Sequence, residues 1–423
     1  MSPSRPPIAK AALFLSLLLA CQTGSLNGPA TGTGGRQGTV ATGGAGGGGG
    51  RTGGQEGGAA GGGSGTGGMV VDAGLGDITR TDAAVDPGID ARATDTRLME
   101  VGPSDGVADV TPGPAAGIDT PPPRPLNVTA PRMRYTHRFR TKDADPQVSF
   151  NDNTQIAVVD TRSAKMVGKL VLPFDGAGTT AGGLGAAGTF CVSRGFHVLG
   201  IAAFQMYDIL KNDPAFYGAA RRQVFEGVEH TRKYDFANIR MVPSDGVAKR
   251  TEMALKYLHR LYPAEDWGYF LNADGTVRWS DVIFTGFSHG ASNSARFAML
   301  VRAWRAVSFA GPRENTCNNF PACLTANGLI SAHWLDEVPA TPRDRFFALT
   351  GTRDDQNQQH LFSMEKIGYS GKPTSMSVGP PYGGSHRIVE EGGGHTSPCN
   401  ETTYKALCNY LFGVAPENLN GIP

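Results

Sequence analysis

The pattern of apolar and polar positions separates a C-terminal part with regular periods from an N-terminal part that has none. Beyond about residue 131, short continuous apolar runs alternate with stretches in which apolar residues recur every three or four positions. Apolar runs bounded by turn residues are typical of strands buried on both faces of a parallel sheet. The predicted strands read MRYTHRF, TQIAVVDT, MVGKLVLPF, FHVLGIAAF, DVIFTGF, AVSFAG, RFFALTG and HRIVEE.

Helical periods lie between these strands. The clearest helix is predicted for residues 247–261, another is predicted to begin at Gly290, and a last one covers ETTYKALCNYLFG near the C-terminus. Strands alternating with helices predict one α/β domain, residues 131–423, built on a doubly wound, mostly parallel sheet of about eight strands. Ligands of such sheets bind outside the carboxyl ends of the strands, so catalytic loops are expected there.

The first twenty residues have the pattern of a signal peptide. Arg5 and Lys10 precede AALFLSLLLA, an apolar run too short to span a bilayer. The run ends in LLAC, which resembles the lipobox of bacterial lipoproteins. We therefore expect residues 1–20 to be removed and Cys21 to carry a lipid that anchors the exported chain to a membrane of the cell envelope. The alternative is a plain secretory signal with an incidental cysteine, which would leave the chain secreted.

Residues 21–130 lack the composition of a packed domain. Glycine is densely repeated between residues 31 and 70, and the stretch that follows is rich in Asp, Thr and Pro. Such a chain buries too little apolar surface to offset its ordering entropy. We predict a disordered linker that holds the folded part away from a membrane.

Charge and cysteine content limit the partners. The chain has 39 Lys and Arg against 38 Asp and Glu, so no net field favours nucleic acid. Export permits disulfides. Cys317 with Cys323 and Cys399 with Cys408 are close enough in sequence to close short loops. The five cysteines after Cys21 also include Cys191, so at least one thiol is left unpaired within the chain. No Cys-x-x-Cys or His-x-x-x-His pair indicates a metal site, and no metal or cofactor is expected.

One serine stands in a pattern that can present a nucleophile. Gly286-Phe287-Ser288-His289-Gly290 fits G-x-S-x-G, with a predicted strand before it and a predicted helix after it. In this setting the serine occupies a tight turn that lifts its Oγ clear of the sheet, and a Cβ on either glycine would collide where strand and helix meet. Ser288 is therefore the predicted nucleophile, and the alternative is an ordinary Gly-Ser turn.

A serine nucleophile needs a base and an acid. The strand RFFALTG runs into a polar loop with Asp354 and Asp355, and HRIVEE ends in three glycines and His395. His395 is the predicted base because it follows a strand end, whereas His386 precedes the same strand and lies at the wrong edge. Asp354 is the predicted acid and Asp355 the alternative, while a helix N-cap role is open to either.

An acyl-transfer site also needs amide donors for the oxyanion. One is predicted to be the backbone N–H of His289. The other is expected from the loop after the third strand, where Gly176, Ala177 and Gly178 offer little side-chain bulk against close backbone approach.

These residues give the domain a resemblance to the α/β-hydrolases: Ser288, Asp354 and His395 follow in the chain order of that superfamily. More narrowly, PPYGGSHRIVEEGGGH and LHRLYPAEDWGYFL resemble a group of exported bacterial hydrolases. The oxyanion segment of that group usually reads Pro-Gly-x-Gly-Gly, where this chain has Phe174-Asp175. The resemblance implies the fold and the reaction class, but no substrate.

The sequence therefore predicts an exported serine hydrolase that forms an acyl-enzyme on Ser288. A small-molecule or polymeric carboxylic ester is the expected substrate, because an alkoxide leaving group needs less help from the general acid than an amine. Two segments, 205–240 and 311–334, could form a cap whose aromatic side chains either line a pocket or pack in the core. The alternative function is a surface-displayed binding protein that keeps this fold with an inactive site.

Overall fold

The computed structural model describes residues 124–203, 214–230, 241–316, 329–396, 398–399 and 402–422. The predicted signal peptide, Cys21 and most of the predicted linker lie outside these residues, as do Cys317 and Cys323. None of the described helices has the length and apolar character needed to cross a membrane.

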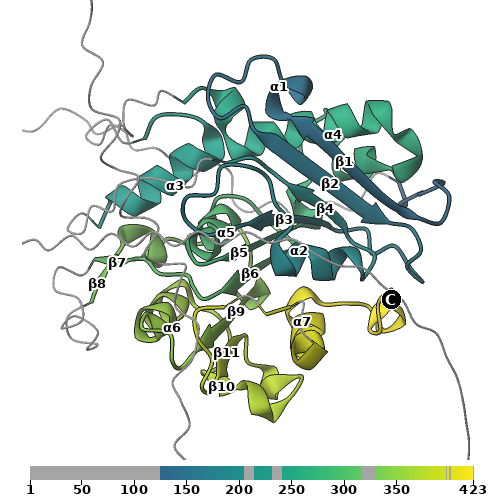
Figure 1. Cartoon of the computed structure of the whole chain (residues 1–423). Helices are drawn as coiled ribbons and strands as arrows, with labels where there is room; N and C mark the ends of the chain where they lie inside the picture. The colour runs from purple at the N-terminus through teal and green to yellow at the C-terminus, as the bar shows by residue number, and fades with distance from the viewer. Residues whose placement is uncertain are drawn as a thin grey trace, which may run out of the picture. The chain divides into compact units, whose positions relative to one another are not determined.

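Nine strands form one sheet in the order β1-β2-β4-β3-β5-β6-β9-β11-β10 (Figure 1). Their bounds are β1 Arg134–Arg140, β2 Thr154–Asp160, β3 Leu170–Phe174, β4 His197–Gly200, β5 Val282–Phe287, β6 Arg305–Phe309, β9 Phe346–Gly351, β10 Thr374–Ser375 and β11 Arg387–Glu390. The β1–β2 and β2–β4 pairs are antiparallel, and the pairs from β4 to β10 are parallel. This confirms the predicted doubly wound, mostly parallel sheet.

The strand count differs slightly from the prediction of about eight. The additional strand, β10, has two residues, which is too short for a hydrophobic period to be read. A separate antiparallel ladder pairs β7 (Asn315–Thr316) with β8 (Ile330–Ser331).

Seven α-helices accompany the strands in the described residues. They are α1 Thr141–Ala144, α2 Gly185–Val192, α3 Phe216–Glu226, α4 Val247–Leu261, α5 His289–Leu300, α6 Asn357–Ile367 and α7 Lys405–Phe412. The bounds of α4 agree with the predicted period, and α5 begins one residue before its predicted start. The last helix begins later than predicted, because residues 402–404 form a 3₁₀ turn.

The sheet is buried on both faces, as its continuous apolar strands require. Alternate side chains of β5 enter two cores: Phe284 packs with Phe297 of α5, whereas Ile283 lies in the core that contains Phe190 of α2 and Leu411 of α7. Because β3, β5, β6, β9 and β11 are parallel neighbours or near neighbours, their carboxyl ends meet at one edge of the sheet. The loops that follow these ends carry every predicted catalytic residue.

Contacts with the domain begin before the predicted boundary at residue 131. The Arg124 guanidinium and the Asn127 N–H both donate to the carboxylate of Asp266. Thr129 N–H donates to the Ala264 carbonyl at 2.9 Å. The composition of this segment resembles that of the linker, but its residues from Arg124 onward bond to the folded part.

Candidate active site

Ser288 lies at the junction of β5 and α5, where the chain turns sharply. Its φ of 55° and ψ of −117° fall outside the regions that a residue with a Cβ ordinarily occupies. The Ser288 N–H donates to the Phe309 carbonyl at 2.9 Å, so the neighbouring strand β6 holds the turn. Such conformations cost about 1–3 kcal/mol and persist where the surrounding structure over-determines them, commonly at functional sites.

The two glycines of the motif make this turn possible. A Cβ on Gly286 would lie 2.1 Å from the carbonyl oxygen of Gly290, and a Cβ on Gly290 would lie 2.1 Å from that of Phe174. Both obstacles are backbone atoms, so a side chain at either position would have to displace a strand or a helix. The steric role predicted for both glycines is therefore present.

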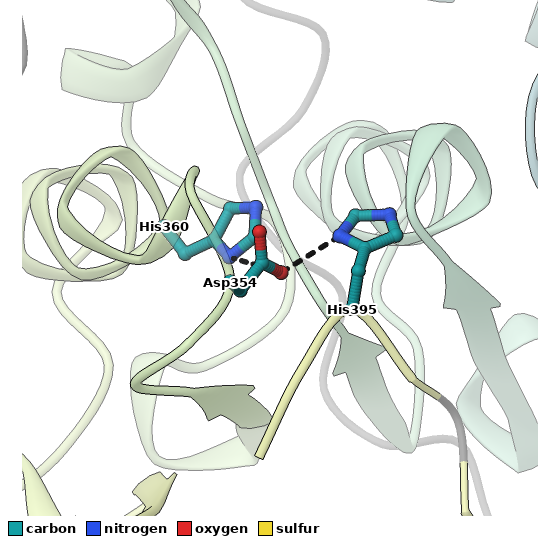
Figure 2. A group of neighbouring side chains, drawn as sticks. All are labelled: Asp354, His360 and His395. Carbon is teal, nitrogen blue, oxygen red and sulfur yellow. Dashed lines mark hydrogen bonds and ion pairs between the residues drawn. The ribbon is translucent and has the colours of Figure 1, made fainter. Parts of the chain in front are cut away.

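Asp354 lies between two imidazoles, as Figure 2 shows. The loop after β9 carries Asp354, the loop after β11 carries His395, and His395 Nδ1 lies 2.7 Å from Asp354 Oδ2. The Asp354 side chain is fully buried, whereas that of His395 is 32% exposed. Asp355, the alternative acid, is exposed at the surface. The structure thus brings His395 together with Asp354 and not with Asp355.

The charge on Asp354 is stabilised although the carboxylate is buried. Burial raises its pKa, but the hydrogen bond with His395, the nearby His360 and the Gln356 N–H, which donates to Oδ1 at 2.9 Å, lower it more. The net pKa lies below the ordinary 3.8. His360 Nδ1 is 3.7 Å from Asp354 Oδ2, and burial lowers the pKa of His360 to about 3. At neutral pH an ionised carboxylate therefore faces a neutral, buried imidazole.

His395 lies close to the Ser288 turn. Its ring is 5.0 Å, centroid to centroid, from the ring of Phe287, the residue before Ser288. No hydrogen bond joins Ser288 Oγ to His395 within the described part of the chain. Catalytic hydrogen bonds are often long without substrate and shorten in the substrate complex. Gly394, directly before His395, has no heavy atom within 4 Å of an added Cβ, which leaves space for such an adjustment.

The predicted oxyanion residues border the same turn. A Cβ on Gly176 would lie 3.8 Å from the Cβ of Ser288, an ordinary contact distance. Ala177 and Gly178 are exposed on the same loop, where Gly178 has a φ of 87°. His289 is the first residue of α5, and the amides of a helix's first turn point out of its N-terminus. Burial lowers the pKa of the His289 side chain well below 6.5, which leaves that ring neutral.

Asp175 shapes the space beneath this loop. Its carboxylate lies against Gly183 and Gly185, where added Cβ atoms would be 2.5 Å and 3.0 Å from the carboxylate oxygens. Burial raises the pKa of Asp175. A cavity of about 170 Å³ adjoins it, lined by residues of β3, of β5 and of the first turn of α2.

The Asp354 cluster has the residue types of a metal site, but not its spacing. One ligand atom from each of Asp354, His360 and His395 lies within 4.8 Å of the others. Two ligands of one tetrahedral zinc ion, each about 2.0–2.2 Å from the metal, are separated by roughly 3.3 Å. The 2.7 Å between His395 and Asp354 is instead a charge-assisted hydrogen-bond distance.

No protein-family model matches the sequence, and no curated protein matches it. Solved structures with a similar chain trace include an esterase from Pyrobaculum calidifontis, which is 11% identical, with 67% of this chain and 87% of that one covered and a TM-score of 0.34. Carboxyl esterase 2 from the fungus Tuber melanosporum is 12% identical, with coverage of 70% and 88% and a TM-score of 0.34. A feruloyl esterase module from Clostridium thermocellum is 11% identical, with coverage of 73% and 96% and a TM-score of 0.33. Similarities of this size leave the function to be argued from the site itself.

A chain of hydrogen-bonded polar side chains lies behind Asp354 and was not predicted from the sequence. His360 Nδ1 lies 2.9 Å from Thr350 Oγ1, which accepts from Asn357 Nδ2 at 3.2 Å. All three side chains are buried. The sequence offers no signal for them, because Thr350 is on a strand, Asp354 is in a loop and the other two are on a helix, so that no single period relates them.

A buried ion pair behind helix α5 was also not predicted. Arg221 of α3 pairs with Glu314, and its Nη1 donates to Asn293 Oδ1 of α5 at 2.6 Å. Trp334 Nε1 donates to the second oxygen of Glu314 at 2.9 Å. Trp334 and Phe216, which belong to the two predicted cap segments, are buried in the core, so these aromatic side chains pack rather than line a pocket.

Proposed function

We propose that the chain is an exported serine hydrolase that cleaves carboxylic esters. The observation that carries this proposal is the backbone of Ser288, a residue with a Cβ held at φ 55° between a strand and a helix that only glycines allow to meet. Strain retained at such a position is explained by the exposure of a reactive hydroxyl. The buried acid and the half-exposed imidazole beside it supply the groups that the hydroxyl requires.

In the proposed reaction, Ser288 Oγ attacks the ester carbonyl while His395 Nε2 takes the hydroxyl proton. Asp354 accepts the Nδ1–H of His395 and so favours the tautomer whose Nε2 is free to act as a base. Backbone amides at His289 and at Gly176 to Gly178 would bind the oxyanion, each donor supplying about 3 kcal/mol. The imidazolium then gives its proton to the leaving alkoxide. Water, deprotonated by His395, attacks the acyl-enzyme and regenerates the Ser288 hydroxyl as the acid departs.

We assign the cavity beside Asp175 as the binding site for the acyl group, and its size favours short acyl chains. With a volume of about 170 Å³, it is smaller than typical sites for drug-sized ligands, which enclose about 300–1,000 Å³. A series of p-nitrophenyl esters tests this assignment. Acetate to butyrate esters should give the highest kcat/KM, and a maximum at long chains would contradict it.

Export and anchoring form part of the same proposal. The pattern before Cys21 supports lipidation, and the disulfide between Cys399 and Cys408 in the described part of the chain is consistent with an oxidising compartment. Radiolabelled palmitate should be incorporated into the full chain and not into Cys21→Ser. Equal labelling of both would remove the anchor from the proposal.

A fluorophosphonate probe tests the nucleophile. The probe should label the full-length protein at one serine, and Ser288→Ala should abolish both labelling and esterase activity. Ser377→Ala, a change at an exposed serine remote in sequence from the site, serves as the matched control and should keep both. A wild-type protein that stays unlabelled while correctly folded would instead favour the binding protein with an inactive site.

A further inference from the structure

A second cavity formed by the described residues lies away from Ser288. It is open to the surface and has a volume of about 540 Å³, within the range of small-molecule sites. Its walls include Arg305, the first residue of β6, Phe347, near the start of β9, and His386, directly before β11. These positions are at the amino ends of parallel strands, whereas Ser288 follows a carboxyl end. A five-residue strand separates the two edges by about 17 Å.

Arg305 brings a desolvated positive charge to this cavity. Its guanidinium lies over the rings of Trp304 and Phe347, at 4.7 Å and 4.1 Å from their centroids. Burial lowers the pKa of Arg305 to about 10, so the group stays charged at neutral pH. It forms no ion pair with a carboxylate of the described residues. Asp344 and Arg345 act on it only at longer range, with opposite signs.

Helix capping accounts for only part of this charge. Arg305 Nη1 donates to the carbonyls of Tyr410 and Leu411, at 2.9 Å and 2.6 Å, at the C-terminal end of α7. A helix C-terminus carries about half of a negative charge, and part of the guanidinium charge is thus balanced. Capping of α7 accounts for the hydrogen bonds of Arg305 Nη1. It accounts neither for the rest of the guanidinium charge nor for the open cavity beside it.

His386 contributes a stacked aromatic ring to the same wall. Its ring stacks on Phe347 at 3.8 Å and donates a hydrogen bond to the Phe346 backbone. Burial lowers the pKa of His386, which favours the neutral ring. Its Nδ1 is buried and has no hydrogen-bond partner among the described residues, so this atom does not face the cavity.

We propose that this cavity binds a small aromatic carboxylate. One guanidinium balances one carboxylate, which favours a monoanion over a phosphate dianion. The Tyr410 ring and Pro380 provide apolar wall for a planar body. The site is independent of the reaction proposed for Ser288, because it shares no residue with that site.

Calorimetric titration of the full-length protein with 4-hydroxybenzoate tests the assignment. One equivalent should bind per chain. Benzoate keeps the carboxylate and the aromatic ring and should bind within about twofold of 4-hydroxybenzoate, because the charge and the ring carry the recognition. 4-Hydroxybenzyl alcohol lacks the charge and should show no measurable binding. Equal affinities of all three compounds would overturn the proposal.

Two substitutions with the same charge change locate the site. Ala406 is exposed on α7 and lines the cavity, so Ala406→Glu should weaken 4-hydroxybenzoate binding about tenfold through repulsion at short range. Val338 is 89% exposed and lies outside the cavity, and Val338→Glu should change the affinity less than about twofold because its charge is screened. Thermal melting checks that both variants fold.

Arg305→Gln should abolish the binding, and Arg305→Lys should restore part of it. If 4-hydroxybenzoate fails to bind, or binds Ala406→Glu as tightly as the wild type, the cavity does not hold an aromatic carboxylate. Neither result would bear on esterase activity, which the fluorophosphonate experiment tests separately.

Discussion

The turn that carries Ser288 is fixed by backbone contacts at the glycine on either side, whereas the residue before His395 lies in open space and the His395 ring is held by a hydrogen bond between side chains. At the turn, added Cβ atoms would meet carbonyl oxygens at 2.1 Å. In the His395 loop, the Gly393 carbonyl accepts from the Arg353 N–H at 2.8 Å, but Gly394 has no heavy atom within 4 Å of an added Cβ. The half of the site at Ser288 is thus defined by sterics, and the half at His395 mainly by the polar contact with Asp354. Substitutions should affect the two halves by different mechanisms.

The largest effect is expected from the polar half. Asp354→Asn should lower kcat by about 10³–10⁴-fold, because an amide no longer fixes the reactive tautomer of His395 or stabilises the imidazolium. Asp355→Asn is the matched control and should stay within about twofold, since Asp355 is exposed. The assay is initial-rate hydrolysis of a p-nitrophenyl ester, and equal, mild losses in the two variants would contradict the assignment of the acid.

A second prediction concerns the steric half. Gly290→Ala should lower kcat by about 10²-fold, because moving Ser288 by as little as 1 Å misaligns its attack, and it should also lower the unfolding midpoint. Gly394→Ala, next to His395, adds the same methyl group where no heavy atom lies within 4 Å, and it should keep most of the activity. If both variants behave alike, the distinction between the two halves fails.

A third prediction uses the pH dependence of stability. The pKa of His360 is lowered from 6.5 to about 3 in the folded protein, so the unfolded chain binds a proton in this window that the folded chain does not. The free energy of unfolding should therefore fall as the pH is lowered from 6.5, by up to about 1.4 kcal/mol per pH unit from this group.

The contribution of His360 is isolated by comparison with His360→Gln. Between pH 6.5 and 4, unfolding of this variant should take up about one proton fewer than unfolding of the wild type, so its free energy of unfolding should depend less steeply on pH. Denaturant titrations at several pH values measure it. His197 is also buried, and burial lowers its pKa to about 4. It contributes equally to the pH dependence of stability in both proteins, so the comparison cancels its effect. Parallel slopes would show that His360 does not titrate as its burial implies.

The smallest effect is expected at the oxyanion loop. Gly176→Ala adds a Cβ at 3.7–3.8 Å from Phe287 and Ser288, which is ordinary contact, and Gly176 has no positive φ. Its backbone amide is retained. The substitution should change kcat/KM less than about fivefold, and a loss comparable with that of Gly290→Ala would mean that this loop is as tightly constrained as the Ser288 turn.

The parts of the site that the sequence allows one to predict are those set by local rules. The Ser288 turn needs glycine at two fixed positions, so five residues and their flanking pattern are enough to predict it. The choice between Asp354 and Asp355 depends on where a strand ends and which side chain turns inward, and local pattern leaves it open. His360 and Arg305 gain their surroundings from elements distant in sequence, so only the folded chain reveals them.

The disulfide between Cys399 and Cys408 joins the segment after His395 to helix α7. The choice of expression host therefore bears on the specific activity of a preparation. Material made in a reducing bacterial cytoplasm would contain two thiols in place of this cross-link, and so a less restrained segment after His395. Periplasmic expression, or refolding in a glutathione buffer, is the appropriate route to protein for the kinetic tests.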